Sequence, residues 1–244
     1  MAPRQDHALA ARGEFALKID RRQVMLRQQV VDMLRSAILE FRFKPGDRLI
    51  ERELCELMGV SRTSVREALR HLESEGLVRN EVNKGPSVAT VTPEEALQIY
   101  EVREALEGVA GRLFAERATD LQVAALQAAL RRLEAAFGTR DTRTIVAEAT
   151  RFYEVFLEGC GNNHIRDLIR SLHARVVYLR ATSMSQPGRA PGSLGEMTSI
   201  VDAIVRRDPA AAEAACKEHV RRASAAALDV LRRRLLETGD GPVP

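Results

Sequence analysis

The sequence predicts a mostly α protein in two parts: three helices with a β-hairpin, then a helical bundle without strands. Helical spacing of apolar residues recurs along most of the chain, whereas β-prone runs occur only in LVRNEV and SVATV, residues 77–82 and 87–91. The composition agrees with this fold class. Ala, Leu, Arg and Glu are abundant and favour helices, while aromatic residues make up only 4% of the chain.

The first element after a loosely ordered arm, residues 1–20, is expected to be a helix. Apolar residues at helical spacing predict it over residues 26–41. A turn at Pro45-Gly46 follows, and ERELCELM then predicts a second, short helix that stops at Gly59. These elements would begin a compact N-terminal domain.

A third helix and a hairpin are expected to complete this domain. Ser61 or Thr63 can cap the helix, and the residues alone do not decide between them. The helix should end near Gly76, and the two β-prone runs then read as a hairpin with Gly85 in its turn. The order of elements fits a winged helix-turn-helix over residues 21–92.

No β-prone run follows Pro93, so residues 93–236 are predicted to form an all-α bundle. Thr92 can cap its first helix, Pro93 suits the first helical position, and Glu95 could complete a capping box. SQPGRAPGS, residues 185–193, is expected to be a loop, and residues 237–244 a disordered tail. The predicted helices span residues 94–118, 120–137, 141–158, 163–183, 194–206 and 209–236.

The third helix carries Arg62, Arg66 and Arg70 at intervals of four, on a different face from apolar Val65 and Leu69. One face can therefore pack on a core while guanidinium groups point outward. A solvated basic face is the plain alternative. A pI near 9.0 is compatible with a nucleic-acid partner, and guanidinium groups suit paired hydrogen bonds to guanine.

Several classes of protein find no support. Three widely spaced cysteines do not suggest a disulfide framework or a zinc knuckle. No apolar run has the length of a signal peptide core or a membrane span, so a cytoplasmic protein with no membrane partner is expected. No triad pattern, glycine-rich phosphate loop or metal-ligand cluster indicates an enzyme, and no cofactor is predicted.

A family resemblance adds to this reading. LRSAILEFRFKPGDRLIERELCELMGVSRTSVREALRHLESEGLV closely resembles the DNA-binding domain of the GntR family of bacterial regulators, and NEVNKGPSV resembles its wing. YEVREALEGVAGRLFAERAT resembles the start of the FCD effector domain of the FadR branch. The sequence departs from the family pattern at Glu40-Phe41, where a glycine is usual, and at Ser64, where proline is frequent.

The resemblance implies contacts to a double-stranded DNA operator. It implies that three arginines contact bases, that three hydroxyl side chains contact phosphates, and that a wing glycine approaches the minor groove. The base contacts are expected from Arg52, Arg62 and Arg66, the phosphate contacts from Ser61, Thr63 and Ser64, and the wing contact from Gly85. Arg70 is expected to be a solvated residue near the DNA backbone.

The resemblance also implies an effector site, with a changed set of ligands. Relatives commonly hold a metal through Asp-x-x-x-His and two further His, but this chain has Ala149, Tyr153 and Met197 at three of those positions, and only His219 matches. We therefore expect no metal. We expect Arg103, with these four residues, to bind a small organic acid; the alternative is a cavity filled by Tyr and Met that binds nothing.

Neighbouring residues do not restore the metal ligands in this interpretation. A register shift by one residue would bring Glu148 or Glu196 into the pattern, but it is expected to turn them away from the site. His164 and His173 are expected to be surface or interface histidines.

Together these features predict a ligand-responsive transcription regulator, a repressor that binds a palindromic operator as a homodimer. One recognition helix reads few base pairs, so two-fold symmetry would supply the rest of the specificity. The alternative is an architectural DNA-binding dimer whose helical bundle is inert. A response to carboxylic acids would separate the two.

Overall fold

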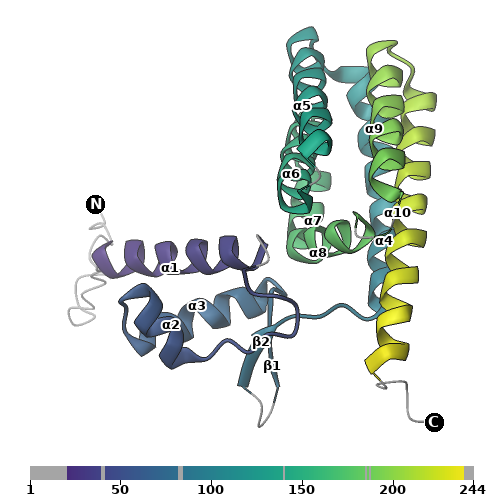
Figure 1. Ribbon diagram of the computed structural model, residues 1–244. Helices are drawn as coiled ribbons and strands as arrows, with labels where there is room; N and C mark the ends of the chain where they lie inside the picture. Colours follow the sequence, from purple (N-terminus) through teal and green to yellow (C-terminus); the bar gives the residue numbers. More distant parts are fainter. Residues whose placement is uncertain are drawn as a thin grey trace, which may run out of the picture.

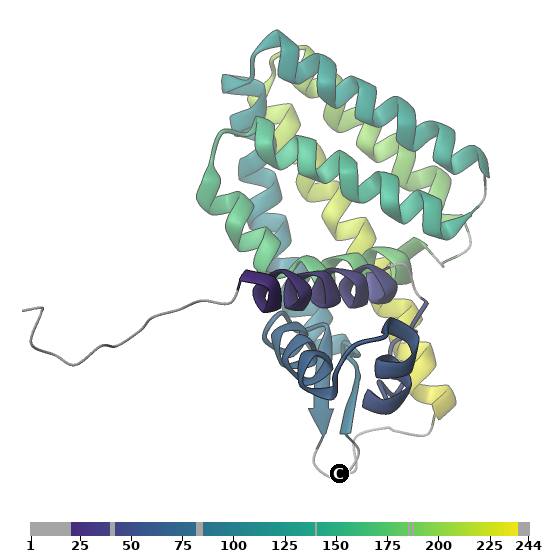
Figure 2. The same cartoon turned by 90° about the vertical axis from the view of Figure 1, so that its left-hand side faces the viewer.

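The protein is described by a computed structural model that covers residues 21–39, 42–81, 85–139, 141–184, 186 and 188–238. A small N-terminal head lies at one end of a helical bundle (Figures 1 and 2). The predicted fold class, a winged helix-turn-helix followed by an all-α bundle, is confirmed. The predicted arm and residues 239–244 of the predicted tail lie outside the described residues.

Three helices and a hairpin share one apolar core in the head. The elements are α1 (Arg21–Leu39), α2 (Glu51–Met58), α3 (Arg62–Ser74), β1 (Val78–Glu81) and β2 (Gly85–Val88). Helix α1 packs on α3, and Leu34, Leu54 and Leu72 are each almost completely buried between the elements. Ser61, not Thr63, caps α3, because its hydroxyl accepts a hydrogen bond from the backbone N–H of Ser64.

The hairpin is antiparallel and pairs Val78 with Val88 and Glu81 with Gly85. The prediction that Gly85 lies in the turn is wrong, since Gly85 is the first residue of β2. Its φ of 77° lies in the left-handed region that favours glycine, so the residue bends the chain as the strand begins. Residues 82–84, between the strands, lie outside the described residues.

Seven helices form the bundle within the described residues, one more than predicted. They are α4 (Pro93–Arg117), α5 (Asp120–Thr139), α6 (Thr142–Gly159), α7 (Asn163–Ser171), α8 (His173–Met184), α9 (Arg189–Val205) and α10 (Pro209–Thr238). Helices α4 and α10 run side by side along the bundle (Figure 1). Thr92 caps α4 as predicted, while the Glu95 carboxylate pairs with Arg175 at 2.9 Å.

The expected helix over residues 163–183 is two helices. It breaks at Leu172, whose backbone leaves the helical region, and α8 then runs across the bundle end that faces the head (Figure 1). Val177 and Ala181 of α8 are buried with Val146 of α6, and Leu39 of α1 packs against them. An apolar contact across the two bodies therefore fixes the direction of α8, which the local sequence pattern could not indicate.

The expected loop over residues 185–193 is shorter than predicted, because α9 begins at Arg189. Gly188, with φ of 77°, precedes the helix. Arg189 is buried and pairs with Glu196 two turns further on, so an ion pair within α9 stabilises a helical start that Gly and Pro disfavour. Within the part of the chain described, no helix combines the length and the apolar character needed to cross a membrane.

Candidate functional site

Helix α3 has the two faces predicted from its sequence. Val65, Leu69 and Leu72 are buried in the head, while Arg62, Arg66 and Arg70 are exposed. A buried apolar face fixes the axis of α3, so the guanidinium groups project from a rigid support. Such a helix can enter a DNA major groove and present hydrogen-bond donors to base edges.

Arg66 is held by a carboxylate on the neighbouring helix. Its Nε donates to both oxygens of Glu51, at 2.8 and 2.9 Å, and this hydrogen-bonded pair raises the pKa of Arg66. Arg52 of α2 is exposed and lies 4.0 Å from Glu56. Arg66 thus has an orientation before any ligand arrives, and a base or phosphate would have to displace or share its contact with Glu51.

Three hydroxyl groups gather at the N-terminus of α3. The Ser61 hydroxyl accepts from the Ser64 backbone N–H and lies 3.1 Å from the Ser64 hydroxyl, and Thr63 is exposed beside them. The positive end of the helix dipole adds to their affinity for anions. Their placement suits phosphate contacts, which stay a prediction.

Two exposed arginines at the wing, one of them outside the hairpin, were not among the predicted site residues. Arg48 and Arg79 are exposed and line a hollow of about 190 Å³ together with Gly85, Ser87 and Thr90. Arg79 pairs with Ser87 across the hairpin, and Arg48 forms a bridge to the same serine. Sequence patterns indicate this pair only weakly, because Arg48 precedes α2 and comes close to the hairpin only in the folded head.

The five residues expected to bind an effector line one cavity in the bundle. Arg103 comes from α4, Ala149 and Tyr153 from α6, Met197 from α9 and His219 from α10. Their convergence was predicted from the family resemblance alone. The free volume is only about 10 Å³, roughly the least that can hold one water molecule, so side chains fill most of the space.

Two ion pairs surround this cavity. Arg103 Nε donates to Glu107 at 2.7 Å, and both side chains are almost completely buried. Arg189 donates to both oxygens of Glu196 at 3.1 and 2.7 Å, and His219 Nδ1 lies 2.8 Å from the same carboxylate. The expectation that Glu196 turns away is therefore wrong: it reaches His219 because helix α9 starts early and faces α10 there.

A third arginine, Arg180 of α8, lines the same cavity without a carboxylate partner among the described residues. It donates to the Thr150 hydroxyl at 2.9 Å, and its guanidinium carbon lies 4.4 Å from the centre of the Tyr153 ring. Burial lowers the pKa of Arg180, because it disfavours the charged form. Three buried guanidinium groups thus face two carboxylates, which leaves an excess of positive charge.

The protonation states are set by burial and by these pairs. Burial lowers the pKa of His219, against the opposing hydrogen bond to Glu196, so the imidazole is neutral near pH 7. The pKa of Glu196 is nevertheless lowered, because its bonds to His219 and Arg189 outweigh its own burial. An ionised carboxylate only accepts hydrogen bonds, so His219 donates from Nδ1 and keeps Nε2 as an acceptor.

Several buried polar atoms around the cavity have no hydrogen-bond partner. They are the hydroxyls of Tyr153, Ser183 and Ser193 and the Nε of Arg189. Burial raises the pKa of Tyr153, so its hydroxyl remains a donor at any physiological pH. Unsatisfied buried donors are rare and costly, and here they gather where positive charge is also in excess.

The donor set does not fit the metal of the family pattern. An alanine methyl, a protonated phenol, a thioether and one imidazole occupy the four positions, and the imidazole already binds a carboxylate that Arg189 shares. Across the residues that the structure describes, no three His, Cys, Asp or Glu side chains lie together as metal ligands would. The site is a polar cavity rather than a metal centre.

Two further histidines lie away from this cavity. His164 is exposed on α7, in agreement with the surface position expected for it. The side chain of His173 lies outside the described residues.

Comparison with known proteins identifies both parts of the chain. Residues 26–88 match the family described as bacterial regulatory proteins, gntR family, and residues 98–222 match the FCD domain. The chain belongs to the GntR family of bacterial transcriptional regulators. This GntR regulator therefore joins a DNA-binding head to an FCD effector domain, and it is a regulator rather than an enzyme.

Relatives of this GntR regulator support the assignment over most of its length. An uncharacterized HTH-type transcriptional regulator, YdhC, from Bacillus subtilis (strain 168) is 30% identical over 79% of this chain and 84% of its own. The galactonate operon transcriptional repressor of Escherichia coli (strain K12) is 29% identical, over 77% of this chain and 90% of its own.

A solved structure agrees with the fold. The crystal structure of a transcriptional regulator GntR from Rhodococcus sp. RHA1 is 26% identical in sequence. It covers 83% of this chain and 97% of its own, with a TM-score of 0.73.

Proposed function

We propose that this GntR regulator represses transcription as a homodimer on an operator with two-fold symmetry, and that a small organic anion bound beside Arg180 changes its affinity for DNA. Arg52, Arg62 and Arg66 contact bases, the hydroxyls at the start of α3 contact phosphates, and the wing approaches the minor groove at Gly85. The exposed arginine row on a rigid α3 supports the base contacts.

The single observation that carries the effector class is the buried Arg180, which has no carboxylate partner in the part of the chain that the structure describes. An uncompensated buried charge costs several kcal/mol, roughly, so a fold that keeps one is stabilised when an anion arrives. The Tyr153 and Ser193 hydroxyls, which line the same inner cavity, have no hydrogen-bond partner among the described residues and can donate to a ligand. A carboxylate provides both the charge and the acceptors that these groups lack.

The names of relatives support the same direction. One relative is a repressor of a galactonate operon, and galactonate is a carboxylate. This supports repression as the sign of regulation and carboxylates as the first compounds to test.

A second candidate, an architectural DNA-binding dimer with an inert bundle, is favoured by one observation. The inner cavity is nearly full, and Arg103 is already paired with Glu107. An inert bundle would need no further ligand.

The test begins with selection of bound duplexes from random DNA at stated salt. Fluorescence anisotropy on the recovered operator then measures affinity with and without a panel of sugar acids, dicarboxylates and fatty acids. A repressor of the proposed kind selects a sequence with two-fold symmetry, and at least one acid changes its affinity. An affinity that no acid changes, with no thermal stabilisation by any of them, favours the inert bundle.

A further inference from the structure

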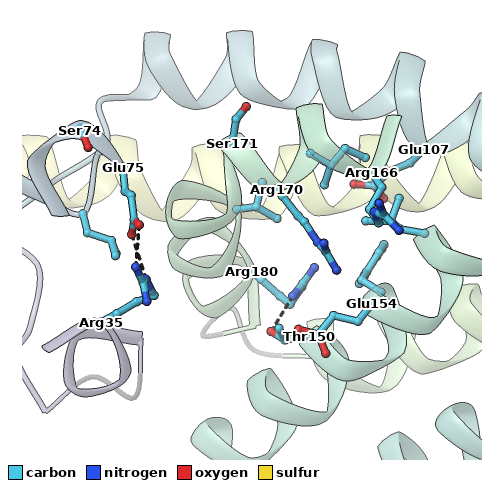
Figure 3. A pocket seen from close by; sticks show the side chains of 15 residues that line it. Arg35, Ser74, Glu75, Glu107, Thr150, Glu154, Arg166, Arg170, Ser171 and Arg180 are labelled. Carbon is cyan, nitrogen blue, oxygen red and sulfur yellow. Dashed lines mark hydrogen bonds and ion pairs between the residues drawn. The ribbon is translucent and has the colours of Figure 1, made fainter. Parts of the chain in front are cut away.

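A cavity lies between the head and the bundle (Figure 3). Its volume is about 500 Å³, within the range of sites for metabolite-sized ligands. Tyr153 and Arg180 line both this outer cavity and the small inner cavity described above. The outer cavity thus reaches the same buried guanidinium group from the side of the head.

The walls of the outer cavity carry more positive than negative charge. Figure 3 shows Arg166 and Arg170 of α7 beside Arg180 in the cavity. Arg166 has only a distant, exposed partner, Asp167 at 3.5 Å, and Arg170 forms no ion pair among the described residues. Among the carboxylates that line the cavity, Glu75 and Glu107 are paired with arginines, so the exposed Glu154 is left to offset these charges.

The paired groups in the walls belong to the two bodies separately. Arg35 of α1 donates to Glu75 at 2.9 and 2.6 Å, so the head presents a neutral pair to the cavity. On the bundle side, Glu107 is held by Arg103.

The lining of the cavity is also partly apolar. Leu77 of the head and Leu157, Ile169 and Val176 of the bundle all contribute to it. A cavity lined by the guanidinium groups of Arg166, Arg170 and Arg180 and by apolar side chains matches a molecule that has two anionic groups and an apolar body.

We propose that this cavity between the head and the bundle is the seat of the effector, and that it binds an organic dianion with an apolar body. One anionic group accepts from Arg180 and the Tyr153 hydroxyl, and the other pairs with Arg170 and Arg166. This inference rests on the proposed function, and it adds where the ligand sits, which chemical class it belongs to and how it affects the head.

Helix α8 connects this seat to the head. Arg180 faces the ligand, while Arg175, on the same helix, pairs with Glu95 and packs over the backbone of Gly76 of the head. A Cβ at Gly76 would lie 2.8 Å from the Arg175 guanidinium, so this contact is close. An occupant that touches Arg180 and the head residue Leu77 at once binds one head position better than another, which is the condition for coupling.

The test uses the full-length protein and straight-chain dicarboxylates from succinate to sebacate as probes, with octanoate and octane-1,8-diol as matched compounds. Calorimetry measures each affinity. A dicarboxylate of intermediate length should bind best, octanoate more weakly, and the diol not at all. Loss of one charge-assisted hydrogen bond in Arg170→Gln should weaken the best probe roughly tenfold.

Matched variants decide the location. Arg170 is exposed, so Arg170→Gln should fold normally, and Arg131→Gln, on exposed α5, is the control that should keep full affinity. Arg180→Gln should remove binding, but it changes a buried residue and is read only together with Arg170→Gln. Equal affinity of the Arg170→Gln and Arg131→Gln variants, or no binding by any dicarboxylate, overturns the proposal.

The proposed function and the proposed effector seat can be refuted by different results. If an acid changes operator affinity but the Arg170→Gln variant responds normally, the outer cavity is not the seat, and the proposed function stands. If no acid binds or changes operator affinity, the effector class itself is wrong.

Discussion

Replacement of Glu107 by Gln should remove a large share of the stability of the protein. The carboxylate side chain is 3% exposed and accepts a 2.7 Å hydrogen bond from Arg103, which is 2% exposed. Gln preserves the size of the side chain but leaves Arg103 as a second uncompensated guanidinium beside Arg180. Breaking a buried pair from one side costs about 3–5 kcal/mol, whereas whole domains have about 5–15 kcal/mol of stability.

The assay is urea unfolding followed by far-ultraviolet circular dichroism, which suits a helical chain without tryptophan. Arg103→Met, Glu107→Leu and the double variant Arg103→Met/Glu107→Leu complete a cycle, and Glu107→Gln is measured beside them. Each single change should lower the free energy of unfolding by about 3–5 kcal/mol, and the double variant should lose much less, because an apolar pair needs no compensation. A double variant as unstable as the sum of the single changes would refute this account of the pair.

The same double variant decides which arginine receives the effector. If Arg180 holds the anion, the folded double variant still binds dicarboxylates, since Arg103 serves only Glu107. If its binding is lost while Arg170→Gln binds normally, Arg103 is the clamp and the argument from Arg180 fails.

Three further outcomes follow from the geometry. Arg66→Ala should lower the affinity for the selected operator roughly tenfold to a hundredfold and remove the base preference at one position. Anisotropy on single-substituted duplexes measures both. An equal loss of affinity on all duplexes would make Arg66 a phosphate contact. Ser61→Ala should lower the free energy of unfolding by about 1 kcal/mol through loss of the α3 cap, with Thr63→Ala as the unaffected control in urea titrations. The pKa of His219 is lower in the folded protein than the ordinary 6.5, so below pH 6.5 the unfolded chain binds more protons than the folded protein. The free energy of unfolding should therefore decrease as the pH is lowered. Urea midpoints from about pH 7 to about pH 5 should show this decrease, and His219→Gln should make it smaller.

Local patterns predicted the parts of the molecule that depend on neighbours in the chain. The two faces of α3 follow from helical spacing, and the Thr92 cap follows from one hydroxyl before a proline. The break at Leu172 and the early start of α9 at Arg189 were missed, because side-chain contacts in the folded protein and not local propensity decide them.

Part of the candidate site was likewise predictable and part was not. The family resemblance predicted that Arg103, Tyr153 and His219 lie together, since a family pattern relates positions that are distant in the sequence. Arg180 carried no such signal, because an arginine in HARVVYLRATS looks like any solvated residue until α8 turns it inward. The outer cavity could not be predicted from sequence patterns, because it is formed where the head and the bundle meet.

The contact between Glu51 and Arg66 has a consequence for the search along a genome. If α3 enters a major groove as proposed, the carboxylate beside Arg66 faces the DNA and is repelled by the phosphates of every duplex, whatever its sequence. Only where a base edge engages the arginine fork is that repulsion offset. Glu51 should therefore shorten the time spent at wrong sites more than at the operator, so that the acid sharpens discrimination while the neighbouring cations supply the attraction.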